Sequence, residues 1–216
     1  MANKSTRRRG SRQFWPRVRA AKPTAVVNSW SSKNVKGVSF LGFPAYKVGM
    51  TNIGVIDNFS NTLTKGTEIN VPVTVLECPA VKVMSVKLLA LDEYGNLQIA
   101  KETVAQLKDK NLSRKLDVAK KAPVVVSVED LIKFAQDNDV EEVRVKIVTT
   151  PSATGIGKKK PEILELGVSG SIEEAINFAH SKLGHEVKAS EVISAGELVD
   201  SHGITIGHGF QGAVKR

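Results

Sequence analysis

VPVTVLECPAVKVMSVKLLAL, residues 71–91, holds two runs rich in valine and leucine that are separated by Cys78 and Pro79. Short apolar runs of β-branched residues bounded by a breaker are typical of β-strands. Pro72 lies near the start of the first run, where a missing backbone N–H costs little. The second run is followed by Glu93-Tyr94-Gly95-Asn96, which is typical of a turn. We therefore predict two adjacent strands, and their short spacing favours a β-barrel or a sandwich.

The residues before this stretch show the same pattern. Short apolar runs at 39–47 and 53–57 flank Val48-Gly49-Met50-Thr51. Because the glycine lies between the two runs, it indicates a turn. We predict two further short strands, joined at that turn.

The middle of the chain combines helices with strands. Residues 97–116 are rich in Lys, Leu, Ala and Glu, which predicts a helix with a break. Ser127 is a candidate N-cap for a helix that ends near Asn138, since acidic residues follow it in the first turn. Ser171-Ile172-Glu173-Glu174 is a capping box for a second helix. Alternating apolar and charged residues at 143–147 predict a strand between the two helices.

These elements define a fold class and a domain division. We predict a mostly β protein with an α/β insertion and a basic, disordered N-terminal arm. The arm takes residues 1–38, the first part of a β-barrel takes 39–95, the insertion takes 96–195, and 196–216 return to the barrel.

Positive charge is concentrated at the start of the chain. Residues 1–56 contain eleven Lys or Arg and no Asp or Glu, whereas residues 57–216 contain 20 basic and 22 acidic residues. The formal net charge of +9 therefore comes from the arm. A segment that repels itself this strongly needs a polyanion to order it. Nucleic acid is the expected polyanion, because Lys and Arg release counterions when they meet phosphates.

Arginines of the arm are interleaved with aromatic residues. Arginine makes planar, bidentate phosphate contacts, and aromatic rings stack on unpaired bases. The candidate nucleic-acid contacts in the arm are Arg7, Arg8, Arg9, Arg12, Phe14, Trp15, Arg17, Arg19, Lys22 and Trp30. A nuclear-import signal, a general nucleic-acid patch and a solubilising tail are the alternative interpretations.

Two glycine-containing segments add further candidates. Residues 154–161, TGIGKKKP, lack the spacing of a Walker A loop. We predict that Lys158, Lys159 and Lys160 contact an RNA backbone, with a solvated surface loop as the alternative. Residues 207–212 match G-x-G-x-x-G, but the helix that a dinucleotide-binding motif requires has no room in this sequence. These glycines more simply allow close approach of an RNA sugar–phosphate chain.

Other kinds of chemistry have little support in the sequence. Cys78 is the single cysteine, so no internal disulfide is expected, and we predict a buried, inert thiol. The four histidines lack metal-ligand spacing, and no nucleophile or paired-carboxylate signature occurs. No apolar run is long enough to span a membrane. We expect no enzymatic activity, no metal, no cofactor and no membrane association.

Four motifs occur in an order that resembles a known family. They are FPAYKVGMT at 43–51, VPVTVLE at 71–77, GIT at 203–205 and GFQGAVKR at 209–216. Together with the arm and the loop at 154–161, they resemble the archaeal form of the universal large-subunit ribosomal protein L-three family. The resemblance extends from the arm to the last residue of the sequence.

The resemblance implies a fold, a function and partners. The family has a translation-protein β-barrel interrupted by an α/β insertion. Its members are structural constituents of the large ribosomal subunit that bind rRNA near its 3′ domain early in assembly and support the peptidyl-transferase region. The implied partners are large-subunit rRNA and neighbouring ribosomal proteins, in the cytoplasm. Positions that match the family's motifs add Lys47, Thr51, His208, Phe210, Gln211, Lys215 and Arg216 to the candidate rRNA contacts.

The sequence departs from the family pattern in two respects. Ile206 and His208 stand where the family usually has lysines, which leaves at most a titratable imidazole there. Family members also continue beyond the position of Arg216, so we expect a second chain or a further C-terminal segment to complete the barrel. The alternative function is a basic RNA-binding assembly or regulatory factor that associates transiently with ribosomes. An RNA-modifying enzyme is disfavoured by the missing catalytic residues.

Overall fold

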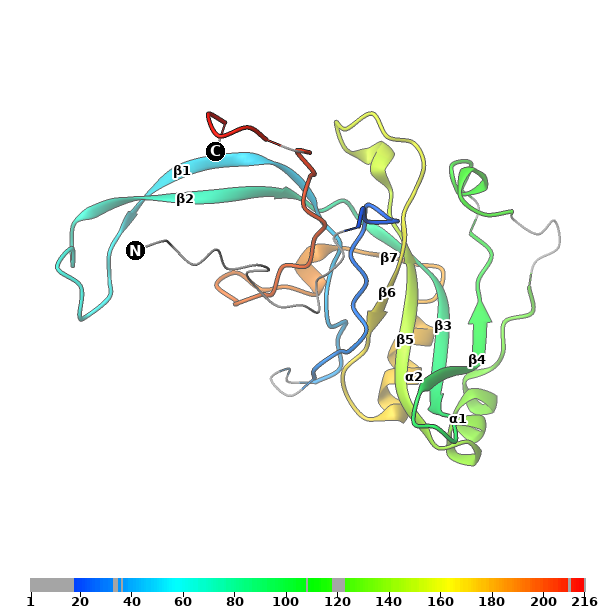
Figure 1. Ribbon diagram of the computed structural model, residues 1–216. Helices are drawn as coiled ribbons and strands as arrows, with labels where there is room; N and C mark the ends of the chain where they lie inside the picture. Colours follow the sequence, from blue (N-terminus) through cyan, green and yellow to red (C-terminus); the bar gives the residue numbers. More distant parts are fainter. Residues whose placement is uncertain are drawn as a thin grey trace, which may run out of the picture. The chain divides into compact units, whose positions relative to one another are not determined.

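A computed structural model describes residues 18–32, 35, 37–107, 109–117, 123–209 and 211–215 (Figure 1). The chain divides into two compact units. The larger unit is Asn28–Leu198, and the smaller unit combines Met1–Val27 with Val199–Arg216. We describe each unit by itself.

Two antiparallel sheets and two α-helices make up the described part of the larger unit (Figure 1). The hairpin consists of β1 (Tyr46–Ile56) and β2 (Glu68–Glu77). The five-stranded sheet has the order β4-β3-β5-β6, and β7 pairs with the start of β3. Its strands are β3 (Val81–Leu91), β4 (Leu97–Val104), β5 (Val140–Val148), β6 (Ile163–Gly167) and β7 (Glu186–Val187). The helices are α1 (Val128–Asp137), α2 (Ile172–Ser181) and the short 3-10 turns η2 (Leu112–Arg114), η3 (Pro151–Ala153) and η4 (Ala189–Glu191).

The core lies between the five-stranded sheet and the two helices. Leu88 of β3 and Val145 of β5 are fully buried and belong to one cluster with Leu131 of α1 and Ile176 of α2. Side chains alternate between the two faces of a strand, so the neighbouring residues of β3 and β5 point to the opposite face. This apolar layer confirms the prediction that 81–91 is a strand and gives it a central place.

Both predicted helix starts are confirmed. The Ser127 hydroxyl accepts a hydrogen bond from the backbone N–H of Asp130 at the start of α1. Ser171 and Glu174 form a reciprocal capping box at the start of α2. These side chains pair backbone groups that the first turn of a helix leaves without partners.

Two predictions of local structure are wrong. Residues 48–51 do not form a turn, because β1 continues through them with an irregularity in its register between Lys47 and Gly49. Residues 97–104 form a strand instead of a helix, since β4 pairs with β3 from Leu97↔Leu91 to Val104↔Ser85. In both places, pairing with a neighbouring strand outweighs the local preference.

The described residues form no closed barrel. The hairpin strands pair only with each other there, and β3 belongs to the same sheet as β4 and β5. β3 thus pairs with strands from the part of the chain after residue 95, and the predicted domain division stays a prediction. Alternation along a strand indicates which face is buried, but it does not indicate which strand lies beside it.

The hairpin has one apolar face that remains exposed. Ile53 pairs with Val71 and Val55 pairs with Ile69, so these four side chains lie on the same face. Ile53 is 46% exposed and Val55 is 39% exposed. An isolated two-stranded hairpin is only marginally stable in water. Exposed apolar side chains on a hairpin of this kind are typical of a surface that packs against another polypeptide segment.

The segment around Asn28 and Trp30, which precedes β1, packs on the face of the five-stranded sheet opposite the helices. Trp30 lies against Gly167 of β6, and the carbonyl of Asn28 accepts a 2.9 Å hydrogen bond from the Arg144 guanidinium. A Cβ atom at position 167 would lie 2.7 Å from Cγ of Trp30 and 3.1 Å from Cδ1 of Leu41. Glycine at position 167 therefore makes room for this segment.

The substitution Gly167→Ala is expected to lower the free energy of unfolding by roughly 1–3 kcal/mol, because overpacking forces neighbouring groups to move. Gly155→Ala is the matched control, since a Cβ there meets no atom within 4 Å. Urea unfolding followed by circular dichroism measures both variants. Equal stabilities for the two would show that Trp30 does not pack tightly on β6.

The smaller unit has no helix or strand in residues 18–27, 199–209 and 211–215. It contains a turn in which the N–H of Lys215 donates to the carbonyl of Gly212. Gly209 has a φ of +68°, a conformation that favours glycine. This unit therefore brings described residues from both ends of the sequence into one compact group.

Candidate nucleic-acid interface

Most of the arm's candidate contacts, Arg7, Arg8, Arg9, Arg12, Phe14, Trp15 and Arg17, lie outside the described residues, as do Phe210 and Arg216. Arg19 and Lys22 are described and exposed in the smaller unit. His208 and Lys215 are exposed in the same unit, and Gln211 is half-buried. The described candidates Arg19 and Lys22 of the arm therefore share one unit with the described candidates of the glycine-rich segment.

The candidates in the larger unit lie in different surroundings. Lys47 and Thr51 are exposed on β1, and Thr51 lies on the apolar face of the hairpin through its pairing with Val73. Trp30 is half-buried against the sheet, and its indole N–H has no hydrogen-bond partner among the described residues. Trp30 thus has a packing role, and its proposed contact with RNA stays a prediction.

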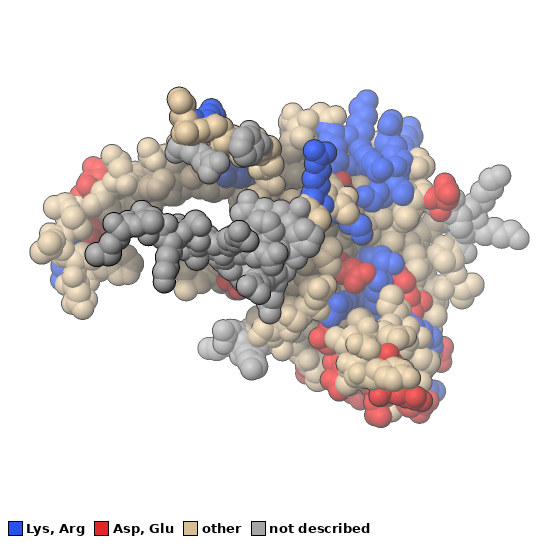
Figure 2. All heavy atoms as spheres, in the orientation of Figure 1, with Lys and Arg blue, Asp and Glu red and all other residues tan. Residues whose placement is uncertain are grey.

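The three lysines between β5 and β6 divide into two groups. The ammonium group of Lys158 forms an ion pair with the Glu162 carboxylate. Lys159 and Lys160 are exposed, and neither forms an ion pair with another described residue. Figure 2 shows Lys and Arg side chains gathered over this loop, above the part of the unit that carries the helices. Lys159 and Lys160 are therefore the lysines of this loop that can meet a phosphate without breaking an internal pair.

Glu162 is a buried carboxylate that organises the base of the loop. Its backbone N–H donates to the Thr149 hydroxyl at 3.0 Å, and Tyr46 donates to the same hydroxyl at 2.9 Å. Its side-chain oxygen Oε1 pairs with Lys158, and the other oxygen, Oε2, accepts a 2.9 Å hydrogen bond from Lys115. Burial alone would raise the pKa of Glu162, but the hydrogen bonds and charges of Lys158 and Lys115 outweigh it, so the pKa is lowered.

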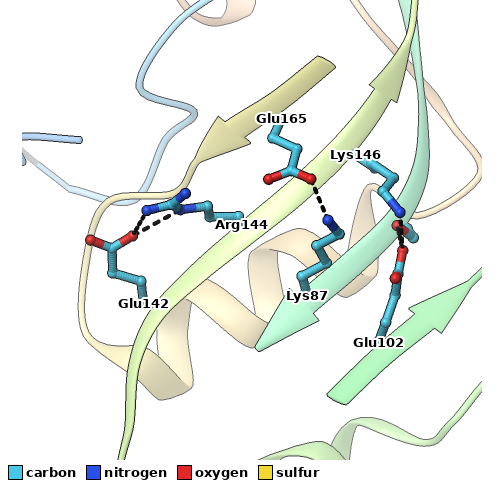
Figure 3. Close-up of polar contacts among 7 residues, drawn as sticks. Lys87, Glu102, Glu142, Arg144, Lys146 and Glu165 are labelled. Carbon is cyan, nitrogen blue, oxygen red and sulfur yellow. Dashed lines mark hydrogen bonds and ion pairs between the residues drawn. The ribbon is translucent and has the colours of Figure 1, made fainter. Parts of the chain in front are cut away.

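A second set of charges is paired within the protein (Figure 3). On the sheet face opposite the helices, Lys87 pairs with Glu165, Lys146 with Glu102, and Arg144 with Glu142. Lys87 and Arg144 are buried. The Lys87–Glu165 pair joins β3 to β6 and the Lys146–Glu102 pair joins β5 to β4, whereas Arg144 and Glu142 both lie on β5. Because a buried cation is costly without its partner, these basic residues hold the sheet together and are not candidates for RNA contact.

Acid is expected to destabilise the larger unit through these carboxylates. Burial raises the pKa of Glu102, but hydrogen bonds from Ser85 and Lys146 lower it below the ordinary 4.5 overall. A lowered pKa in the folded state gives stability that is present above pH 4.5 and is lost as the pH falls through the folded value. Urea unfolding at a series of pH values measures this loss. Glu102→Gln should reduce the slope below pH 4.5, and an unchanged slope would contradict this assignment.

Several basic residues near the loop were missed by the sequence interpretation. Lys110, Arg114 and Lys115 lie in a segment that was predicted to be helical, so no pattern marked them as a surface group. Lys158 and Glu162 are four residues apart, and this spacing could have indicated that the two side chains pair. Nothing in the sequence indicates that Lys115 shares the same carboxylate, because the two residues are far apart in the chain.

Other functional groups are few in the part of the chain that the structure describes. Cys78 is exposed, so the prediction of a buried thiol is wrong, although partial desolvation raises its pKa. No group of three or more His, Cys, Asp or Glu side chains among the described residues could hold a metal ion. None of the described helices has the length and apolar character to cross a bilayer.

Comparison with known proteins adds an independent finding. A family model described as ribosomal protein L3 matches residues 1–216. The chain is similar to proteins named large ribosomal subunit protein uL3. It is 40% identical to that of Methanococcoides burtonii over 100% of this chain and 41% identical to that of Archaeoglobus fulgidus over 97%. With the protein of Methanocaldococcus jannaschii the identity is 39%, over 97% of this chain.

The chain spans less than two thirds of the length of these relatives. The matched region covers 64% of the M. burtonii protein and 61% of each of the other two.

Proposed function

Because the chain belongs to the ribosomal protein L3 family, we propose that it is a non-catalytic structural constituent of the large ribosomal subunit. The segregation of charge carries this proposal. Eleven basic residues precede the first acidic residue, while the remainder of the chain is nearly balanced. A protein of this kind binds a polyanion at one end and presents an ordinary folded surface at the other.

The proposed ligand is large-subunit rRNA near its 3′ domain, bound early in assembly. Support comes from the arm, where arginines alternate with Phe14 and Trp15. Arginine and aromatic residues together suit RNA, whose unpaired bases stack on rings while the phosphates pair with guanidinium groups. Neighbouring large-subunit proteins are the proposed protein partners, and the cytoplasmic ribosome is the proposed location.

The smaller unit is proposed to contact rRNA along both of its segments. Arg19 and Lys22 come from one segment, and His208 and Lys215 come from the other. The glycines around His208 leave the backbone accessible to a sugar–phosphate chain. Replacement of the family's lysines by Ile206 and His208 gives this contact a weaker positive charge.

The hairpin is proposed to be one part of a translation-protein β-barrel. Its apolar face includes Ile53, Val55, Ile69 and Val71. Each Å² of apolar surface that stays exposed to water costs about 25 cal/mol of free energy relative to burial. A further polypeptide segment, or a second chain, is the proposed cover. Either would also pair the open edges of β1 and β2, which otherwise invite aggregation.

Sedimentation through a sucrose gradient at high salt tests the proposed function. A structural constituent is expected to stay with the large subunit at about one copy per particle. A basic assembly or regulatory factor would exchange and move to the top of the gradient, because salt screens a contact that is mainly electrostatic. Release of the protein together with a normal subunit population would contradict the structural role.

A further inference from the structure

Two segments of the larger unit, which together carry six Lys or Arg and two Asp residues, share one carboxylate. The first segment, 109–117, contributes Lys115, which lies 2.9 Å from one oxygen of Glu162. The second segment, 151–161, contributes Lys158, which pairs with the other oxygen of the same carboxylate. Only about 10% of the Glu162 side chain is exposed. The carboxylate therefore holds two segments that are distant in sequence side by side.

An apolar cluster joins the same two segments. Leu112, from the first segment, is buried together with Met84 and Leu107. Val148 and Ile163, which flank the second segment in β5 and β6, belong to the same cluster. Apolar packing and the two ion pairs of Glu162 therefore both hold the two segments next to each other.

The cations that remain exposed on these segments are arranged around this anchor. Lys110 and Arg114 are exposed on the first segment, and Lys159 and Lys160 are exposed on the second. None of the four forms an ion pair with another described residue. Figure 2 shows Lys and Arg side chains gathered at the end of the unit where the loop between β5 and β6 lies, whereas Asp and Glu predominate on the visible face at the end with α1 and α2. The larger unit is therefore polarised, with the two segments at its basic end.

We propose that segments 109–117 and 151–161 form one binding surface for the phosphate backbone of RNA, with Glu162 as its positioning residue. The inference rests on the proposed function and adds a second contact region, separate in sequence from the arm. An RNA backbone fits because it presents phosphates to cations without requiring a shaped pocket. The core of a protein interface is instead depleted in charge, unlike these segments.

Glu162 acts on this surface through its neighbours. Its ion pairs with Lys115 and Lys158 fix the two segments relative to each other. The exposed cations of both segments, Lys110, Arg114, Lys159 and Lys160, are thereby held on one surface. The negative charge of Glu162 by itself opposes phosphate binding. Its positioning effect and its charge effect thus have opposite signs, and a measurement of affinity can separate them.

The exposed cations are tested first, in the full chain, with a transcript of archaeal large-subunit rRNA as the probe. The double variants Lys159→Ala/Lys160→Ala and Lys110→Ala/Arg114→Ala should each lower the slope of log affinity against log salt by about 1.4–1.8, the value for two lost phosphate contacts. Lys133→Ala is the control, because Lys133 is exposed on α1 at the acidic end. A slope that falls no further in the double variants than in Lys133→Ala would overturn the proposal.

Glu162→Gln then tests the positioning role. The variant keeps the volume of the side chain and makes the chain more positive, yet we expect binding to the transcript to weaken roughly threefold to tenfold. Glu141→Gln makes the same change of charge at an exposed site on β5, and its affinity should be unchanged or slightly higher. Tighter binding by Glu162→Gln would overturn the positioning role.

A double-mutant cycle distinguishes positioning from a loss of folding. The weakening caused by Glu162→Gln should become smaller when Lys159 and Lys160 are already alanine, because only Lys110 and Arg114 then remain to be positioned. A general loss of stability would weaken binding equally in both backgrounds and would contradict the proposal. Melting temperatures identify that case directly.

The outcomes separate this inference from the proposed function. If the full chain does not bind the transcript, the proposed function fails. If it binds and the two-segment variants bind with the same slope, only this inference fails. If the variants bind the transcript normally but no longer enter assembled large subunits, the surface meets a protein neighbour, and the RNA assignment is overturned.

Discussion

Removal of residues 2–22 is expected to lower the slope of log affinity for rRNA against log salt by about 3–4. This segment carries eight Lys or Arg residues, and each phosphate contact on duplex RNA is taken to add about 0.9 to the slope, the value measured for duplex DNA. The estimate assumes that half of the eight residues contact phosphates. Between 50 and 200 mM salt, the intact chain should therefore lose about 100-fold more affinity than the shortened chain. The measurement is filter binding or anisotropy at several salt concentrations.

The position of the cut matters for this experiment. Asn28 and Trp30 pack on the five-stranded sheet, so a longer deletion would disturb the fold as well as the charge. A variant with lysine in place of every arginine of residues 2–22 is the control. It keeps the charge and should keep the slope, while it loses bidentate contacts and binds more weakly at every salt concentration. A shortened chain with an unchanged slope would show that the arm is not the main contact.

Leu88→Ala is expected to lower the free energy of unfolding by about 3 kcal/mol. Leu88 is fully buried in the middle of β3 and belongs to one apolar cluster with residues of both helices, so its truncation leaves a cavity that a rigid sheet fills poorly. Urea unfolding followed by circular dichroism measures the change.

Val75→Ala on β2 is the matched control for this substitution. Val75 is 44% exposed, so its truncation should cost less than about 1 kcal/mol. The contrast between the two variants tests where the stability of the larger unit resides. Equal losses would contradict the separation between a well-packed sheet and an exposed hairpin.

The sequence predicted those elements whose signals are local. The strand at 81–91 follows from an apolar run with clear boundaries, and the helix at Ser171 follows from its capping box. The strand at 97–104 was mistaken for a helix because its Lys, Ala and Glu residues favour helices when considered alone. Pairing with β3 determines its structure, and that pairing is a contact between separate parts of the chain.

The candidate interface was predictable to a similar extent. Composition alone identified the basic arm and the lysines at 158–160. It did not indicate that Lys158 is paired with Glu162 or that Trp30 packs against Gly167. Both contacts depend on which elements become neighbours in three dimensions, and they change the expected role of each side chain. A charge or an aromatic ring in a sequence therefore marks a candidate, and its surroundings decide whether it is free to bind.

The pairing of β3 with β7 has a consequence for the order of events during synthesis. Val81 of β3 pairs with Val187, so the ribosome must make nearly all of the larger unit before this sheet is complete. Contacts between such distant residues slow folding. The arm leaves the exit tunnel long before β7 does. We therefore expect the first residues of β3 to stay without their β7 partner, and open to unwanted pairing, until late in synthesis.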